Sequence, residues 1–388
     1  MSHSTAKGSR KKASKPSKHS KDFPLFPHTS GLWCKKIKGE HKYFGVWSDP
    51  DAALKRYNDF IAGKSTDGLT VKALVNSFLD AKEAKMKSGE MSPRSFRDYH
   101  RTCSGLVEFF GRPQLVEDLR PEDFGRLRSH LSHTRGAVSL GNEVIRCRSV
   151  FRFASENDLI PKPVKYGTYF AKPDRNAVRR AKVKRGRMTF EAAEIRKLLD
   201  KANPVMKAMI LLGINAAYGQ SDIASLPQNA VNLKTGWLDY ARQKTGIERK
   251  IPLWPETIES LKAAIAARPK PLESDDDALV FVTKHGRPWV RTKLNAKEEI
   301  IALDSILPEF QKLIDSVKGV ARLGFYSLRH THRTVADGVK DQPACNAIMG
   351  HVDETMAGNY RHDIEEHRLR AVTNHVRKWL FPPRRAAK

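Results

Sequence analysis

The stretch MGHVDETMAGNYRHD, residues 349–363, places a single tyrosine, Tyr360, nine residues after His351. A buried tyrosine normally lies in an apolar pattern, whereas Tyr360 has polar and charged neighbours. Shortly upstream, YSLRHTHRT (326–334) predicts a helix that carries Arg329. A tyrosine, a histidine and an arginine thus share one short segment, and their spacing guides the interpretation of the rest of the chain.

The C-terminal half, residues 188–388, predicts a mainly helical domain with a small β element. PVMKAMILLGINAAY (204–218) is apolar on nearly all sides, which is typical of a buried helix. GWLDYARQKTGIERKIPLW (236–254) alternates around a Lys-Thr-Gly turn and predicts a β-hairpin. We expect one capped helix with Thr189 as its N-cap, and a last helix in HRLRAVTNHVRKWLF (367–381).

The N-terminal half divides into four segments. Residues 1–22 are basic, lack the apolar run of a secretory signal and predict a disordered tail. Residues 23–66 predict a small sheet with one helix, an arm-type unit that either binds DNA or only packs on its neighbour. Residues 67–168 repeat a 3.6-residue apolar period and predict a helical domain, and 169–187 predict a basic linker. The expected fold class is therefore mainly α with small β elements (α+β).

The charge of the chain predicts a polyanionic partner. Its 388 residues, enough for two or three domains, include 70 Lys+Arg against 43 Asp+Glu, a formal net charge of +27 at pH 7. Such an excess favours double-stranded DNA, because neutralised phosphates release counterions. The alternative is that the charge serves solubility alone. The DNA-binding candidates are arginines expected on outer helix faces: Arg94, Arg97, Arg101, Arg146, Arg148 and Arg152.

Two further features bear on the cellular setting. No apolar run approaches the ~20 residues that a membrane span requires. The four cysteines are far apart and lack the spacing of a zinc site or a disulfide framework. We expect a protein of a reducing compartment, cytoplasmic and associated with the nucleoid, in a prokaryotic or phage context.

The order of the motifs resembles that of the tyrosine recombinases, the phage-integrase family. YSLRHTHRT, IMGH (348–351) and Tyr360 are similar to the C-terminal signature of the family. QKTGIERKIPL (243–253) resembles its hairpin lysine motif, and LLGINAAYGQSDIASL (211–226) resembles the turn that carries its first catalytic arginine. Region 67–168 is similar to the core-binding domain. The resemblance implies a site-specific recombinase or integrase of mobile elements that cuts and rejoins DNA through a 3′-phosphotyrosyl intermediate.

The resemblance also assigns roles to single residues. Tyr360 would be the nucleophile, Arg329 a phosphate clamp, His351 a donor to the same phosphate and Lys244 the general acid for the leaving 5′ oxygen. Arginine suits the clamp because its planar, always charged fork can meet two phosphate oxygens. His332 is expected to serve packing. Such a site uses neither a metal nor a cofactor, and the family implies a homo-tetramer on DNA.

The chain departs from the family pattern twice. Gly219 occupies the position of the first arginine, and Tyr326 that of the first histidine of the helix motif. A phenol can still hydrogen-bond a phosphate, so Tyr326 stays a site candidate. The missing arginine matters more, because loss of one preorganised donor typically costs ~10²–10³ in rate. Two substitutes are possible: Gln220 beside the gap, and Arg333 on the motif helix, for which the alternative is an ion pair with Asp337.

Two functions therefore compete. The first is an active recombinase, and the second is a recombinase-fold DNA-binding protein that no longer cuts because of Gly219. Retention of Lys244, Arg329, His351 and Tyr360 at suitable spacing favours activity. An RNA-binding protein would lack support, because no RNP or KH-type signature is present.

Overall fold

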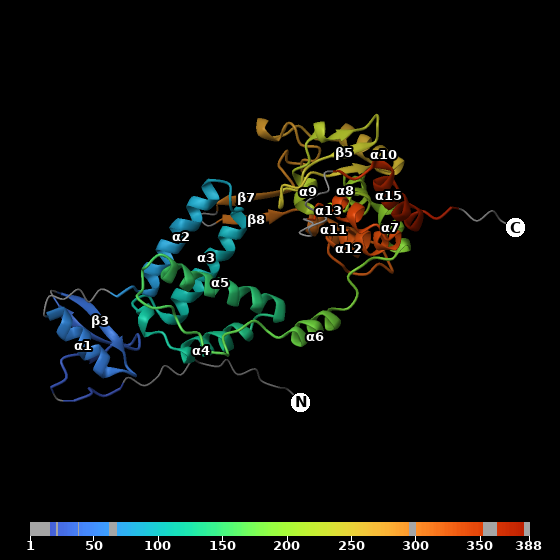
Figure 1. Ribbon diagram of the computed structural model, residues 1–388. Coiled ribbons are helices and arrows are strands. Elements are labelled where there is room, and N and C mark those ends of the chain that lie inside the picture. Colours follow the sequence, from blue (N-terminus) through green and yellow to red (C-terminus); the bar gives the residue numbers. More distant parts are fainter. Residues whose placement is uncertain are drawn as a thin grey trace, which may run out of the picture. The chain divides into compact units, whose positions relative to one another are not determined.

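The computed structural model describes residues 16–20, 22–37, 39–61, 68–294, 300–351 and 363–383. The chain divides into two compact units, Met1–Lys184 and Arg185–Lys388 (Figure 1). Each is mainly helical and contains small antiparallel sheets, which confirms the expected fold class. Most of the basic tail predicted for residues 1–22 lies outside the described residues.

The first unit begins with three strands and continues as helices. Its elements are β1 (Phe26–Pro27), β2 (Leu32–Ile37), β3 (Glu40–Val46), α1 (Pro50–Ile61), α2 (Val71–Lys87), α3 (Pro93–Phe110), the 3-10 turn η1 (Val116–Asp118), α4 (Pro121–Ser132), α5 (Ala137–Glu156) and α6 (Arg175–Arg185), which crosses into the second unit.

The small sheet has the order β1-β2-β3, and α1 covers it. Asp49 caps α1, since its carboxylate accepts from the Ala52 amide at 3.1 Å. Phe44 on β3 and Trp33 on β2 lie in a separate small core. Arg56 on α1 forms an ion pair with Asp118 of η1, so this segment packs on the helical part of its unit. Its DNA-binding role stays a prediction.

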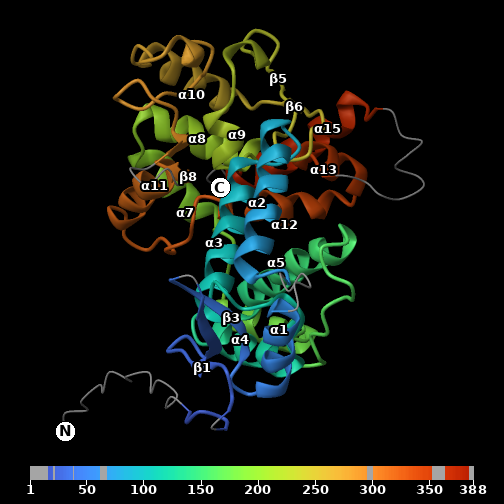
Figure 2. The same cartoon turned by 90° about the vertical axis from the view of Figure 1, so that its left-hand side faces the viewer.

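The helical part follows from caps and apolar periods. The Thr70 hydroxyl accepts from the Ala73 amide at 3.1 Å to begin α2, and Ser92, followed by Pro93, caps α3 in the same way. Helices α2, α3 and α5 pack together around one buried cluster, and Figure 2 shows α2 beside α3. The region predicted as helical from its 3.6-residue period is therefore helical.

The segment predicted as a linker, 169–187, contains α6. No residue of α6 is buried. A helix that buries nothing needs no apolar stripe, so periodicity does not reveal it.

The second unit surrounds one large core. Its elements are α7 (Ala192–Lys201), α8 (Pro204–Asn215), α9 (Gln220–Ala224), η2 (Gln228–Ala230), β4 (Val231–Asn232), β5 (Trp237–Asp239), β6 (Lys250–Pro252), α10 (Pro255–Ala266), η3 (Ser274–Asp276), β7 (Val290–Leu294), β8 (Ile300–Asp304), α11 (Ile306–Asp315), α12 (Ser327–Ala336), η4 (Asp337–Val339), α13 (Gln342–Met349) and α15 (Glu366–Leu380).

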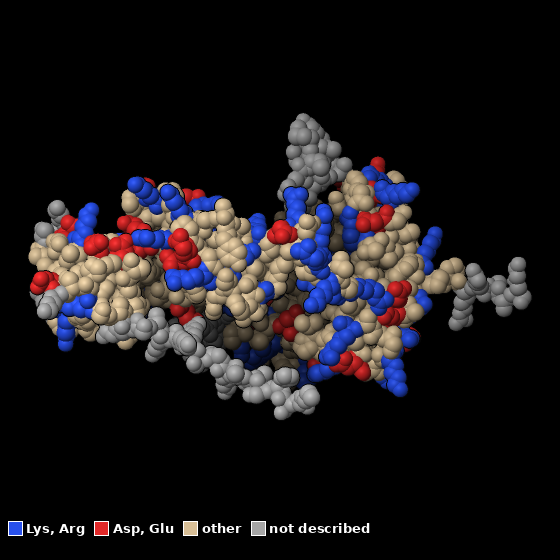
Figure 3. Space-filling view, turned by 90° about the horizontal axis from the view of Figure 1, so that it is seen from below, with Lys and Arg blue, Asp and Glu red and all other residues tan. Residues whose placement is uncertain are grey.

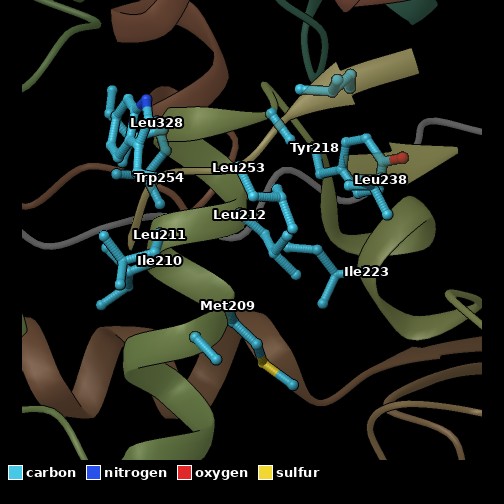
Figure 4. Packing of buried hydrophobic residues seen from close by; sticks show 14 of the residues in the cluster. Met209, Ile210, Leu211, Leu212, Tyr218, Ile223, Leu238, Leu253, Trp254 and Leu328 are labelled. Atoms are coloured by element: carbon cyan, nitrogen blue, oxygen red, sulfur yellow. The ribbon is translucent and has the colours of Figure 1, made fainter. Parts of the chain in front are cut away.

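Helix α8 is buried along most of its length and forms the centre of this core (Figure 4). Its last residue, Asn215, accepts hydrogen bonds from the Trp254 amide and the Thr257 hydroxyl, both at 2.9 Å. The Asn215 amide donates to the Pro252 carbonyl at 3.1 Å. These buried bonds fix the end of α8 against β6 and α10, so the turn after α8 starts from a rigid point.

The predicted hairpin at 236–254 is confirmed, because β5 pairs antiparallel with β6. The N-cap prediction for Thr189 is wrong: Glu191 occupies the cap of α7. There the Glu191 amide donates to the Glu194 carboxylate at 2.7 Å, and Arg187 also binds that carboxylate, which shifts the helix start by two residues. The hairpin β7–β8 was not predicted from the sequence.

The last helix, α15, packs on the core of its own unit. Val376 and Leu380 are fully buried, and Arg196 donates to the Leu380 carbonyl at 2.6 Å. The ring of Phe381 meets Trp254 edge-on with 6.3 Å between centroids. The apolar residues of this segment up to Phe381 therefore close their own domain.

Charge is spread over the surface of the second unit. On the face drawn in Figure 3, blue Lys and Arg side chains are scattered over this unit between tan residues, with red Asp and Glu among them. Across the described part of the chain, no helix has the length and apolar character needed to cross a bilayer.

Candidate active site

Arg329 lies on α12 and is almost wholly buried, with 2% of its surface exposed. Its Nη1 donates to the Ala217 carbonyl at 2.5 Å and its Nη2 to the Met349 carbonyl at 2.6 Å. A guanidinium has five N–H donors, so these two bonds leave three for other partners. Ala217 is held in the left-handed region at φ +54°, a strained backbone for a residue with a Cβ. Arg329 therefore joins the turn after α8 to the end of α13.

His351 follows the end of α13, where Gly350 adopts φ +59° as the C-cap. Its Nε2 lies 3.2 Å from Nη2 of Arg329, so Nε2 accepts and the neutral ring keeps its proton on Nδ1. Burial, followed by the positive charges of Arg329, Arg242 and Arg333, lowers the pKa of His351 below its ordinary value. A neutral imidazole with one N–H donor thus stands beside a buried cation.

The turn of the β5–β6 hairpin docks on the same segment. The Thr245 hydroxyl donates to the Gly350 carbonyl at 3.2 Å, and Arg242 Nη1 donates to it at 3.1 Å. A Cβ on Gly350 would lie 3.0 Å from the Cβ of Arg242 and 2.9 Å from the Cδ of Arg249. Only glycine permits this approach, which explains the Gly-His pair. Lys244 lies in the docked turn and is exposed.

Beneath this turn lies a buried ion pair. Arg249 is 1% exposed, and its Nη2 contacts the Asp222 carboxylate at 3.0 Å. Its guanidinium also stacks over the Tyr218 ring, 4.1 Å from the centroid. The other Asp222 oxygen accepts from the Gly219 amide at 3.1 Å and begins α9. The pair fixes the turn that carries the departure from the family pattern.

The two departures from the family pattern lie in contact. A Cβ on Gly219 would stand 3.1 Å from Cε2 and 3.3 Å from Cδ2 of Tyr326. The Tyr326 ring therefore lies over the place where a side chain at 219 would begin, and it meets His330 edge-on. Tyr326 is 42% exposed, so its ring stays accessible from solvent. The two departures from the family pattern therefore affect the same place in the site.

The two possible substitutes are both bound elsewhere. Gln220 donates to the Asp304 carboxylate at 3.3 Å. Arg333 forms an ion pair with Asp337 at 2.9 Å and donates to Asn346 at 2.8 Å. Within the described residues neither side chain bonds to Arg329 or His351, although the charge of Arg333 reaches His351. Their roles stay predictions.

Tyr360 lies outside the described residues, which resume at Asp363. Of the predicted site residues within them, the structure brings Arg329 and His351 into direct contact and places the turn of Lys244 on the adjacent carbonyl. No group of three His, Cys, Asp or Glu side chains that could hold a metal occurs in the described ranges.

The arginines proposed for DNA binding fall into two groups. Arg94, Arg101 and Arg152 are exposed, and Arg97 is half-buried beside Asp98. Arg146 binds Glu143 at 2.7 Å, and Arg148 donates to the Phe170 carbonyl at 2.7 Å. These last two guanidinium groups hold their own domain together, so the exposed three are the better candidates for phosphate contact.

The sequence interpretation missed Arg242, Arg249 and Asp222. Arg242 stands two residues before Lys244 in the hairpin, and this proximity was the available signal. Arg249 and Asp222 are ordinary charged residues in sequence, and only their burial distinguishes them.

Comparison with known proteins relates part of the chain to one family. Residues 188–367 match the model described as Phage integrase family. No curated protein sequence matches the chain. Among solved structures, a lambda integrase tetramer bound to a Holliday junction is similar, with TM-score 0.54 and 16% identity over 89% of this chain and 99% of that one. The Tn1549 transposon integrase in complex with transposon right end DNA has TM-score 0.53 and 16% identity over 80% of this chain and 100% of that one.

At these identities the structural likeness shows the fold alone, and the family match supplies the class. The fold and the matched domain define an enzyme of DNA recombination. Residues 188–367 form a domain of the phage integrase family, the tyrosine recombinases.

A buried histidine behind the site makes the stability of the domain pH-dependent. His332 is wholly buried, its Nδ1 donates to the Ile214 carbonyl at 2.7 Å, and its Nε2 lacks a partner among the described residues. Burial, mainly, lowers its pKa from 6.5 to about 4. The unfolded state therefore binds more protons between these values, and stability falls as pH drops below 6.5. Between pH 7 and pH 5 we expect a loss of about 2 kcal/mol from this group.

Urea unfolding of the full chain at pH 7 and pH 5 measures this loss. In His332→Gln the pH-dependent part should shrink by about 2 kcal/mol, because the titrating group is gone. His330→Gln, on the exposed side of the same helix, is the matched control and should keep most of the pH dependence. An unchanged pH dependence in His332→Gln would contradict the prediction.

Proposed function

We propose that this chain cuts and rejoins DNA at a specific site through a 3′-phosphotyrosyl bond to Tyr360. One observation carries the proposal. Arg329, His351 and the turn of Lys244 form a single hydrogen-bonded cluster around the carbonyls of Met349 and Gly350. This cluster brings cations and hydrogen-bond donors from three elements to one place, which suits the binding of a phosphate during phosphoryl transfer.

In the proposed step the Tyr360 phenolic oxygen attacks the scissile phosphorus, its proton passes to solvent water, and the bond to the 5′ oxygen breaks. The Lys244 ammonium gives its proton to the leaving 5′ oxygen. The Arg329 N–H groups and the His351 Nδ1–H donate to the non-bridging oxygens. The phosphotyrosyl ester conserves the bond energy, so attack by a 5′-hydroxyl reverses the step and rejoins a strand.

The protonation of His351 suits this role. With its pKa lowered, the ring is neutral before DNA arrives and adds no further positive charge beside Arg329. A bound phosphate would bring a negative charge near the ring and raise that pKa again. We further propose a homo-tetramer on two duplexes, because the lambda integrase that this chain resembles forms a tetramer on a Holliday junction.

Covalent trapping tests the proposal. The protein is incubated with nicked duplexes from a randomised pool, denatured, and analysed for a protein–DNA adduct that peptide mapping then locates. We expect an adduct at Tyr360 in the wild type and none in Tyr360→Phe, since phenylalanine has no nucleophilic oxygen. DNA binding is measured in parallel by gel shift, and should be equal for both proteins.

The matched control is Tyr169→Phe, which removes an exposed phenol from the first unit and should leave the adduct unchanged. An adduct that persists in Tyr360→Phe would assign the nucleophile elsewhere. Binding of the pool by the wild type without any adduct would favour the DNA-binding protein that no longer cuts, for which Gly219 is the specific observation.

A further inference from the structure

The position that lacks an arginine cannot be refilled by its neighbours as they stand. Gly219 offers no side chain, and the Tyr326 ring lies 3.1 Å from where one would begin. Gln220 is bound to Asp304, and Arg333 to Asp337 and Asn346. A second cation for the phosphate must therefore come from another element.

Arg242 reaches the site from the β5–β6 hairpin. Its Nη1 donates to the Gly350 carbonyl at 3.1 Å, while Arg329 Nη2 donates to the preceding carbonyl, that of Met349, at 2.6 Å. The two guanidinium groups thus hold consecutive carbonyls directly before His351. The electrostatic effect of Arg242 on its neighbours agrees with this geometry. After burial, the charge of Arg242 is among the causes that lower the pKa of both Arg329 and His351.

The charge of Arg242 is not compensated within the described part of the chain. Among these residues Arg242 forms no ion pair, and its guanidinium donates to a carbonyl, that of Gly350. Arg329 likewise bonds to two carbonyls and a neutral imidazole. The third arginine nearby, Arg249, differs because Asp222 neutralises it. Two half-buried or buried guanidinium groups without a described carboxylate form a site that favours an anion.

We propose that Arg242 is a catalytic residue that neutralises the scissile phosphate together with Arg329, in place of the arginine absent at position 219. This inference rests on the proposed function, strand cleavage by Tyr360. The hairpin then supplies two groups from one turn, the proton of Lys244 and the guanidinium of Arg242. The alternative is a purely positioning role, in which Arg242 only caps the end of α13 by its bond to Gly350.

A neutral phosphate analogue separates these roles. The site selected by trapping is synthesised with an ordinary phosphate or a methylphosphonate, which lacks the negative charge, at the scissile position. On the phosphate, Arg242→Gln should form the adduct ~10²–10³ more slowly than the wild type, and Arg242→Lys should recover part of the loss. On the methylphosphonate the two proteins should differ by only a few fold, because no charge remains to be neutralised. Arg322→Gln, an exposed arginine of the same unit, should match the wild type on both.

A restored arginine gives an independent measurement. Gly219→Arg with Tyr326→His, which removes the ring from the path of the new side chain, should recover at least tenfold of the rate lost in Arg242→Gln. If Arg242→Gln forms the phosphate adduct at a rate within threefold of the wild type, this inference is overturned and the proposed function stands. A defect that is equal on both substrates and not recovered by Gly219→Arg/Tyr326→His would assign Arg242 to positioning. Absence of any wild-type adduct would instead overturn the proposed function, and this inference with it.

Discussion

Arg329→Lys is expected to lower the rate of adduct formation by ~10²–10³ while DNA binding changes little. Lysine keeps the charge, but its single ammonium group cannot bond to the Ala217 and Met349 carbonyls at the same time. In arginine, Nη1 reaches the first carbonyl and Nη2 the second. The N–H groups that we propose bind the phosphate are then lost, and His351 loses the N–H that fixes its tautomer. Single-turnover cleavage of the trapped site, with binding by gel shift, measures both quantities.

The control for this variant is Arg322→Lys, whose side chain is 71% exposed and pairs with Asp315 on the surface. It should cleave at the wild-type rate. Equal cleavage by Arg329→Lys and the wild type would mean that the geometry of the fork is irrelevant, and would contradict the assignment of Arg329 as the clamp.

Asp222→Asn is expected to destabilise the second unit by about 3–5 kcal/mol, because it leaves the Arg249 charge buried without its partner. Arg249 has no exposed side-chain surface, and its Nη1 already lacks a partner among the described residues. Asparagine keeps the size of the side chain and can still accept from the Gly219 amide, so the loss reports the charge. Urea unfolding followed by tryptophan fluorescence measures the change.

Asp315→Asn provides the matched comparison, since it removes the carboxylate of an exposed pair with Arg322. Such pairs contribute about 0–1 kcal/mol, so its unfolding midpoint should stay close to that of the wild type. A loss below about 1 kcal/mol in Asp222→Asn would show that solvent reaches Arg249, and the buried pair would then not be what fixes the turn before α9.

Much of the fold can be predicted from local sequence rules, such as helix capping and apolar periodicity. Thr70 and Ser92 mark helix starts because a hydroxyl caps the first free amides of the helix that follows it. The buried helix α8 is apparent from its apolar residues alone. Local rules fail where a distant partner decides: Glu191 replaces Thr189 as the cap of α7 because Arg187 and the Ala321 amide hold the Glu194 carboxylate in place.

The features of the site likewise fall into two groups, those predictable from one segment of sequence and those that depend on packing between segments. The spacing of Arg329, His351 and Tyr360 is a property of one segment, so the family resemblance and the expected chemistry follow from that segment alone. The partner of Gly219 is not encoded in any segment, since Tyr326 comes from a separate helix. The same holds for Arg242, which lies 108 residues from the carbonyl that it binds. Which cation stands beside Arg329 depends on how the hairpin and the end of α13 pack together, and no local sequence pattern encodes that contact.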